Sequence, residues 1–219
     1  VSAKICGLKT PESVDAAIAG GARYLGFVFY PPSPRALAPE AAAPLAALLP
    51  ASAQSVAVFV DPTDDAIRAA LAAHPFDILQ LHGQESPARV AAIQTRFARP
   101  VMKAIPVASR EDIEIATRYK DSADLLLFDA KAPKSMADAL PGGNGLRFDW
   151  ALLAAHWQSD RPWMLSGGLD AEHLAEAVAI SKASIVDVSS GVEDRPGEKS
   201  VARIQAFLGA VDQLNLDQG

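Results

Sequence analysis

Residues 3–20 read AKICGLKTPESVDAAIAG, an apolar run that ends at a glycine and leads into an alanine-rich segment. A short apolar run bounded by turn residues is typical of a buried strand. Thr10 and Pro11 form a helix start signal, because a threonine side chain caps free backbone N–H groups and proline fits the first helical turn. This stretch therefore predicts one strand–helix unit, with the strand over 3–8 and the helix over 11–20.

The same unit recurs along the whole chain. Apolar runs that read as strands occupy residues 3–8, 24–30, 55–60, 78–83, 100–105, 125–130, 162–168 and 184–190. Segments with helical spacing lie between them, most clearly at 64–73 and 86–96. Eight such units without a break in composition predict the α/β class, as a closed (β/α)8 TIM barrel that forms a single domain over residues 1–219. An open doubly wound sheet is the alternative, but no GxGxxG follows the first strand.

The composition limits which classes of binding partner and which cellular compartment are expected. Half of the 219 residues are hydrophobic, 21% are charged and the formal net charge is -6. No segment concentrates Lys or Arg, which argues against nucleic acid or an anionic membrane as a partner. No apolar run reaches the ~18 residues of a membrane span, and no signal peptide is visible. The single cysteine and the absence of a visible signal peptide make the cytoplasm the expected location. No Cys/His cluster has the spacing of a metal site. A monomer is expected, because no long exposed apolar stripe is visible.

Polar residues alternate with apolar ones near the ends of several predicted strands. Because successive strand residues face opposite sides, Cys6 should face the barrel interior with Lys4, and Asp129 should face it with Leu125 and Leu127. Polar groups inside a barrel are costly unless they are paired or used. By the same argument, the inward set comprises Lys4, Cys6, Gln80, His82, Lys103, Asp129 and Asp187.

Cys6 and Asp129 are candidates for a base and an acid, because each ends a predicted strand at the barrel rim where active sites lie. The alternatives are a buried small hydrophobe for Cys6 and a helix cap for Asp129. A thiol that acts as a base has to be more acidic than its usual pKa of ~8.5. Lys4 or loop N–H groups would favour this. Asp187 is expected either to neutralise Lys4 or Lys103 or to take part in catalysis.

Small residues follow the seventh and eighth predicted strands. Such loops let backbone N–H groups approach a phosphate, and barrels often bind phosphate at this position. The candidate phosphate-binding residues are Gly167, Gly168, Ser189, Ser190 and Gly191. A third glycine loop, 142–145, follows the sixth strand.

Arg35 ends a proline-rich loop, YPPSPR over residues 30–35, after the second predicted strand. Prolines stiffen the loop and so lower the entropic cost of fixing the arginine. A fixed guanidinium can hold a carboxylate through two parallel hydrogen bonds. An exposed arginine on a rigid loop is the alternative.

The chain resembles the phosphoribosylanthranilate isomerase family, which has a single (β/α)8 barrel. The segments that carry the resemblance are KICGL, GFVFYPPSPR, LQLHG, LLLFDA, GGNGLRFDW, LSGGL and DVSSGVEDRPGEKS, in this order over nearly the full length. Asn144 departs from the family pattern, which more often has threonine there.

The resemblance implies an Amadori rearrangement of N-(5-phosphoribosyl)anthranilate in tryptophan biosynthesis, without metal or organic cofactor. It implies Cys6 as general base, Asp129 as general acid and Arg35 as ligand of the anthranilate carboxylate. Gly7 and His82 are further candidates for substrate contact.

Two rival functions follow from the same residues. A barrel enzyme could form a Schiff base through Lys4, Lys103 or Lys131. A non-catalytic phosphate-binding barrel would not require Cys6 and Asp129 together at the strand ends. Whether the analogous aminoimidazole substrate of histidine biosynthesis is accepted is left open.

Overall fold

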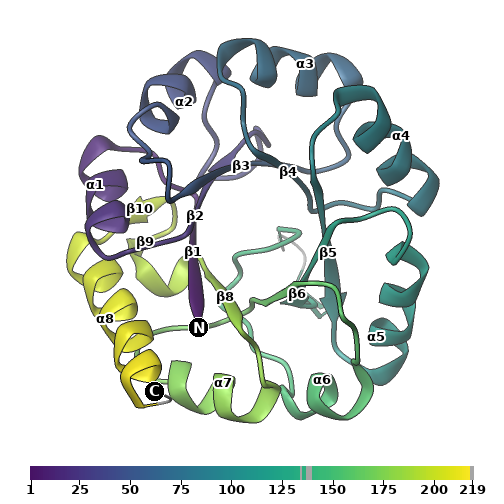
Figure 1. Ribbon diagram of the computed structural model, residues 1–219, viewed down its shortest axis with the longest axis vertical. Coiled ribbons are helices and arrows are strands. Elements are labelled where there is room, and N and C mark those ends of the chain that lie inside the picture. The colour runs from purple at the N-terminus through teal and green to yellow at the C-terminus, as the bar shows by residue number, and fades with distance from the viewer. Residues whose placement is uncertain (134, 137–139, 218–219) are drawn as a thin grey trace.

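The computed structural model describes residues 1–133, 135–136 and 140–217. Eight parallel strands close in chain order into a barrel, with β1 paired to β2 on one side and to β8 on the other (Figure 1). These strands are β1 (Ser2–Cys6), β2 (Tyr24–Val28), β3 (Gln54–Phe59), β4 (Ile78–Leu81), β5 (Val101–Val107), β6 (Leu125–Ala130), β7 (Trp163–Leu165) and β8 (Ile185–Val188). The predicted closed (β/α)8 barrel is confirmed.

Helices surround the barrel and connect successive strands (Figure 1). They are α1 (Pro11–Ala19), α2 (Pro39–Ala46), α3 (Asp64–Ala73), α4 (Pro87–Phe97), α5 (Arg110–Ala116), α6 (Ala151–His156), α7 (Leu174–Ser181) and α8 (Val201–Asp217), with short 3-10 turns η1 (Thr117–Tyr119) and η2 (Ser190–Val192). The predicted start signal at Thr10 is confirmed, since its hydroxyl accepts the N–H group of Ser13. The hydroxyl of Ser86 caps α4 in the same way by accepting the N–H group of Arg89.

The two faces of each strand pack in different cores. On β6, Leu126 and Phe128 join the cluster between strands and helices, whereas Leu127 joins the cluster that fills the barrel. Cys6 also belongs to the interior cluster. Gly26 on neighbouring β2 makes room for it, since a Cβ there would lie 2.9 Å from the sulfur. The alternation predicted for β1 and β6 is therefore confirmed.

Lys103 is an exception to the predicted set of inward residues. It shares its face of β5 with Val101 and Ile105, which pack against the helices. Its ammonium donates to the carbonyl oxygen of Gly83 at 2.8 Å and pairs with Glu85 at 3.0 Å. The expectation that Lys103 enters the barrel and is neutralised by Asp187 is wrong, because the observed strand alternation puts Met102 and Ala104 inside instead.

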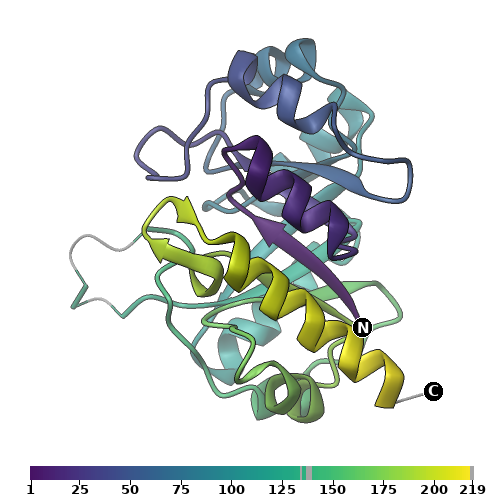
Figure 2. The same ribbon diagram turned by 90° about the vertical axis from the view of Figure 1, so that its left-hand side faces the viewer.

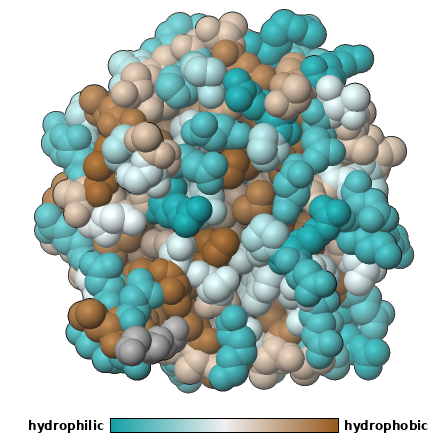
Figure 3. Space-filling view, viewed as in Figure 1, coloured by the Kyte–Doolittle hydropathy of each residue, from teal (hydrophilic) through white to brown (hydrophobic). Residues whose placement is uncertain are grey.

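A hairpin of β9 (Glu193–Arg195) and β10 (Glu198–Lys199) follows η2 and was not foreseen from the sequence. Figure 2 shows this hairpin at the end of the barrel opposite to both chain termini. The face around the termini carries hydrophilic side chains with apolar ones scattered among them (Figure 3). Over the described residues, no helix combines the length and apolar character that crossing a membrane requires.

Candidate active site

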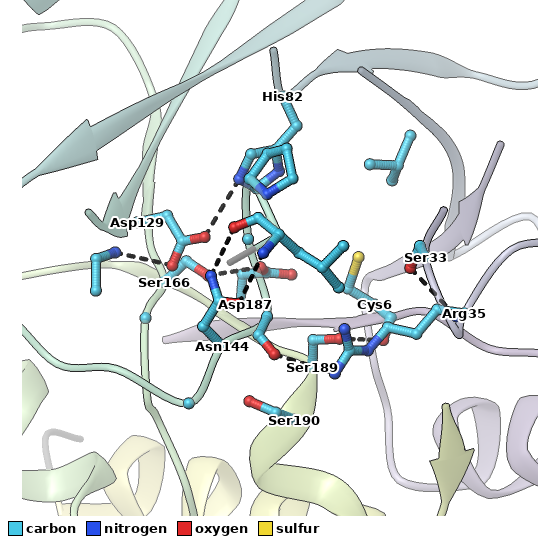
Figure 4. Close-up of a pocket in the computed structure, with 18 of the residues that line it drawn as sticks. Cys6, Ser33, Arg35, His82, Asp129, Asn144, Ser166, Asp187, Ser189 and Ser190 are labelled. Carbon is cyan, nitrogen blue, oxygen red and sulfur yellow. Dashed lines mark hydrogen bonds and ion pairs between the residues drawn. The ribbon is translucent and has the colours of Figure 1, made fainter. Parts of the chain in front are cut away.

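A pocket opens at the carboxyl ends of the strands, where barrel enzymes place their active sites. Cys6 at the end of β1 and Asp129 near the end of β6 lie in its wall, and Figure 4 shows both directed toward the cavity. The wall also includes Ser33, Arg35, His82, Ser166, Gly167, Gly168, Asp187, Ser189, Ser190 and residues 140–146. Residues that are far apart in the sequence are thus brought into one pocket.

The carboxyl group of Asp129 is held at both oxygens. Oδ1 accepts the backbone N–H of Ala130 at 2.9 Å, and Oδ2 lies 3.2 Å from Nε2 of His82. Nε2 of Gln80 donates to Nδ1 of the same imidazole at 3.0 Å. Because Nδ1 is then an acceptor, the proton of a neutral His82 lies on Nε2 and points at Asp129.

Cys6 lies beside a buried ion pair. The ammonium of Lys4 is 2.8 Å from Oδ1 of Asp187, whose Oδ2 accepts the hydroxyl of Ser166 at 2.8 Å. Burial lowers the pKa of Lys4, but the charges of Asp187 and Cys6 outweigh it, so the pKa is raised and Lys4 stays an ammonium. Of the two roles expected for Asp187, the structure shows the ion pair with Lys4.

The thiol of Cys6 is not more acidic than an ordinary cysteine. Burial raises its pKa, the charge of Asp187 raises it further, and the charges of Lys4 and Lys199 offset this only in part. The expectation of a lowered pKa is therefore wrong for the site as it stands. The sequence reveals the neighbouring lysine, but not that the thiol is almost fully removed from solvent.

Arg35 is buried and already bound to a carboxylate of the protein. Its Nε and Nη2 atoms each lie 2.8 Å from an oxygen of Glu193, and Nη2 also donates to the carbonyl oxygen of Gly143 at 3.1 Å. The two parallel bonds that we expected toward a ligand are therefore formed with Glu193. Nη1 remains for a ligand, and it lies next to Gly143 in the pocket wall.

Lys199 connects this ion pair to the loop after β8. Its ammonium lies 2.6 Å from Glu193 and donates to the carbonyl oxygen of Ser189 at 2.9 Å. The hydroxyl of Ser189 in turn donates to the carbonyl oxygen of Cys6 at 3.1 Å. Sequence reasoning missed Glu193 and Lys199 as site residues, although both stand in the segment 187–200 that carries the family resemblance.

The loops after β7 and β8 form part of the pocket wall, and several of their backbone N–H groups have no partner among the residues that the structure describes. The N–H groups of Gly167, Gly168, Ser190 and Gly191 donate to no other described residue. Ser190 and Gly191 also open η2, a short 3-10 turn directly after β8. Unpaired N–H groups at the start of a helical turn favour an anion.

Two of the candidate residues, Gly7 and Gly191, do not line the pocket. Gly7 is in contact with the side chain of Arg35, where a Cβ would come within 2.7 Å of Cδ. Gly191 packs against the carbonyl oxygen of Leu169, which a Cβ would approach to 1.9 Å. The lack of a side chain at Gly7 and Gly191 leaves the space that Arg35 and Leu169 occupy.

The glycine loop after β6 covers part of the site. Gly142 lies against Asp129 and His82, since a Cβ there would be 2.7 Å from Oδ2 and from Nε2. The amide of Asn144 bonds both the N–H and the carbonyl oxygen of Leu140, at 3.1 and 2.6 Å. Across the described part of the chain, no cluster of His, Cys, Asp or Glu has the geometry of a metal site.

Fold and pocket together define a (β/α)8-barrel enzyme, with a thiol, a carboxyl group and a guanidinium around one cavity at the carboxyl ends of the strands. The family model for N-(5'-phosphoribosyl)anthranilate isomerase matches residues 3–210. The chain belongs to this family and is an isomerase, as its resemblance implied.

Individual relatives agree with the family model. The N-(5'-phosphoribosyl)anthranilate isomerase of Parvibaculum lavamentivorans is 56% identical over 210 residues, which cover 96% of this chain and 97% of that protein. The crystal structure of phosphoribosyl anthranilate isomerase from Thermotoga maritima matches with a TM-score of 0.86 at 33% identity, covering 97% and 99% of the two chains. A crystal structure of such an isomerase in complex with reduced 1-(o-carboxyphenylamino)-1-deoxyribulose 5-phosphate matches with a TM-score of 0.84 at 32% identity, with the same coverage.

Proposed function

We propose that this isomerase of tryptophan biosynthesis rearranges N-(5'-phosphoribosyl)anthranilate to 1-(2-carboxyphenylamino)-1-deoxyribulose 5-phosphate, with Asp129 as general acid and Cys6 as general base. The observation that carries the proposal is their position in one pocket wall, on β6 and β1, at the carboxyl end of the barrel. A thiol and a carboxyl group at the two sides of a cavity can move two protons on one bound sugar.

The reaction is an isomerisation that proceeds by proton transfers and needs no other reactant; two of these transfers are assigned to Asp129 and Cys6. Protonated Asp129 donates to the furanose ring oxygen, the bond from that oxygen to C1′ breaks, and the nitrogen lone pair forms a Schiff base at C1′. The thiolate of Cys6 then removes the proton from C2′ and leaves an enolamine. The enolamine takes up a proton at C1′ and loses the proton of its 2′-hydroxyl group, which gives the ketone, so that product and substrate have the same atoms.

The surroundings of the two groups fit these roles. His82 and the N–H of Ala130 orient the carboxyl group of Asp129. Lys4 supplies a fixed positive charge beside the thiol of Cys6, which favours the thiolate at the moment it acts as a base. The carbonyl oxygen of Cys6 is held by Ser189, so the backbone that carries the thiol is also fixed.

The phosphate and the anthranilate carboxylate of the substrate would bind to different parts of the pocket. The phosphate fits the unpaired N–H groups after β7 and β8, at Gly167, Gly168 and Ser190. The anthranilate carboxylate fits Nη1 of Arg35. The reported complex of a family member with a reduced deoxyribulose 5-phosphate product supports a phosphorylated small molecule as ligand.

A Schiff base formed on a lysine is the second mechanism to test. The ammonium of Lys4 is fully buried and bound to Asp187, and Lys103 faces the helices, where it binds Glu85. Lys131 is half exposed and pairs with Asp112 at 2.5 Å. None of these three amines lines the pocket described above, which favours acid and base catalysis.

One assay tests the activity and one trapping experiment tests the mechanism. The purified chain should consume phosphoribosylanthranilate, followed as loss of its fluorescence, and the absence of turnover would refute the function. Borohydride added during turnover should leave the mass of the protein unchanged. A covalent adduct on Lys4, Lys103 or Lys131 would replace acid and base catalysis with lysine chemistry.

The monomeric state and the cytoplasmic location remain predictions. Large exposed hydrophobic side chains are spread along the chain, for example Leu48 after α2, Ile115 on α5 and Leu216 near the end of α8. This distribution favours a monomer, which light scattering during gel filtration would test.

A further inference from the structure

Glu193 is the first residue of the β9–β10 hairpin, and the mechanism above gives it no part. Its carboxylate is buried and accepts hydrogen bonds from Nε and Nη2 of Arg35 and from Lys199. We propose that Glu193 is a positioning residue that sets the affinity for the substrate carboxylate by holding Arg35 with Nη1 toward the pocket. The inference rests on the proposed function, in which Arg35 binds that carboxylate.

The hydrogen bonds of Arg35 leave one nitrogen for a ligand. A guanidinium has five N–H donors. The Nε–H and one proton of Nη2 are used by Glu193, and the second proton of Nη2 is used by the carbonyl oxygen of Gly143. Nη1 donates to no residue in the described part of the chain, so a substrate carboxylate in the pocket would meet this nitrogen.

Glu193 is anchored on its own side, which makes it a support for Arg35 rather than a competitor of the substrate. Its Oε1 also lies 2.6 Å from Lys199 of β10. The hairpin turn packs on the loop that precedes Arg35, since a Cβ at Gly197 would lie 2.4 Å from the carbonyl oxygen of Pro34. A substrate that displaced Glu193 would leave two buried cations less well paired, at a large cost.

The charges of the cluster favour an anionic ligand. Arg35 and Lys199 carry two positive charges and Glu193 one negative charge. Burial raises the pKa of Glu193, but the hydrogen bond from Arg35 and the charge of Lys199 outweigh it, so the pKa lies below its usual value and Glu193 is ionised at neutral pH. One positive charge is left for the ligand, on a side chain that is already ordered before binding.

The test compares two ligands on the same protein sample. One is the reduced product analogue, and the other is the same compound without the ring carboxylate; calorimetry gives the Kd of each. The preference for the carboxylate compound is the ratio of the two Kd values. Glu193→Gln should lower this preference about 10-fold, close to the loss of one charge-assisted hydrogen bond. In turnover, the variant should show a raised KM with kcat nearly unchanged.

Two further proteins separate this role from a general loss of structure. Glu193→Gln added to Arg35→Ala should leave the preference as it is in Arg35→Ala alone, because Glu193 acts through Arg35. Asp124→Asn is the matched control. It neutralises a carboxylate that binds the N–H of Val101 at the opposite end of the barrel, and it should leave the preference at the wild-type value.

The outcomes distinguish the inference from the function on which it rests. An unchanged preference in Glu193→Gln would overturn the inference, and tighter binding of the carboxylate compound would show that Glu193 competes with the substrate. A wild-type preference in Arg35→Ala would instead refute the proposed role of Arg35. If Glu193→Gln does not fold, Glu193→Asp, which retracts the carboxylate by one methylene, should lower the preference in the same direction, and a wild-type preference there would overturn the inference.

Discussion

Nε2 of His82, the residue directly after β4, lies 3.2 Å from Oδ2 of Asp129 on β6, and both residues line the pocket. These two strands are not neighbours in the barrel, since β5 lies between them. Gln80 fixes the imidazole of His82 by a hydrogen bond to Nδ1, the ring nitrogen that does not face Asp129. His82 therefore acts on the proposed acid, whether or not it also touches the substrate.

We expect His82→Ala to lower kcat about 10-fold, because Asp129 loses the partner that orients Oδ2 and a misplaced acid transfers its proton less often. Steady-state kinetics on phosphoribosylanthranilate would measure this. His74→Ala is the control, since that histidine packs on Phe76 outside the pocket. A raised KM with unchanged kcat in His82→Ala would assign His82 to substrate binding alone.

Cys6→Ser should lower kcat by at least ~10²-fold with a small change in KM, the range expected when a general base is lost. The serine hydroxyl has nearly the shape of the thiol but does not ionise in the working pH range. Binding of the reduced product analogue should be nearly unchanged, which calorimetry would show. Near-normal turnover would remove Cys6 from the mechanism.

Asp129→Asn keeps the shape of the side chain but cannot donate a proton to the ring oxygen. We expect kcat to fall by roughly 10²-fold, which steady-state kinetics would measure. Asp187→Asn serves as the comparison, because Asp187 is a second carboxylate of the wall and is bound to Lys4. If Asp187→Asn lost turnover while Asp129→Asn retained it, Asp187 would be the acid.

Strand periodicity was sufficient to place most of this site. The alternation in KIC and LLLFDA put Cys6, Lys4 and Asp129 inside the barrel, and the helix start at Thr10 was visible from residue types alone. Lys103 was misplaced because a run such as VMKAI does not show which of its two faces is inward. The pairing of Arg35 with Glu193 joins residues 158 positions apart, and no local pattern predicts such a contact.

The pH dependence of kcat/KM reports on Cys6, since the free enzyme needs a thiolate to act. Burial and the charge of Asp187 raise the pKa of the thiol, whereas Lys4 and Lys199 lower it. Activity should therefore rise with pH through the pKa of Cys6. Lys4→Met removes one of the groups that lower this pKa and leaves the charge of Asp187 uncompensated. The acidic limb of the kcat/KM profile should therefore move to higher pH.

Lys103→Met is the matched control for Lys4→Met. Lys103 is equally buried but faces the helices, where it binds Glu85. Its removal should lower stability without moving the acidic limb of the kcat/KM profile, measured at a temperature where the variant is fully folded across the pH range. A limb at the wild-type position in Lys4→Met would show that Lys4 does not control ionisation of the thiol.

Phosphate binding should depend on backbone N–H groups of the loops after β7 and β8, and glycine substitutions are a poor test of this. Gly168 has φ +61°, and a Cβ there would lie 2.6 Å from the carbonyl oxygen of Leu146. Gly168→Val would therefore disturb the loop itself. Ser190 is the better position, since it lines the pocket and opens η2.

A crystal grown with sulfate should hold the anion between these loops, with at least two backbone nitrogens in hydrogen-bond distance. Ser190→Ala should weaken inorganic phosphate about twofold to tenfold, because one hydrogen bond is worth about 0.5–1.5 kcal/mol and the backbone donors remain. Ser33→Ala is the control, since Ser33 lines the pocket beside Arg35 and accepts its backbone N–H. It should bind inorganic phosphate as the wild type does. An anion found only beside Arg35, or equal losses in both serine variants, would mean that the two ends of the substrate lie the other way round.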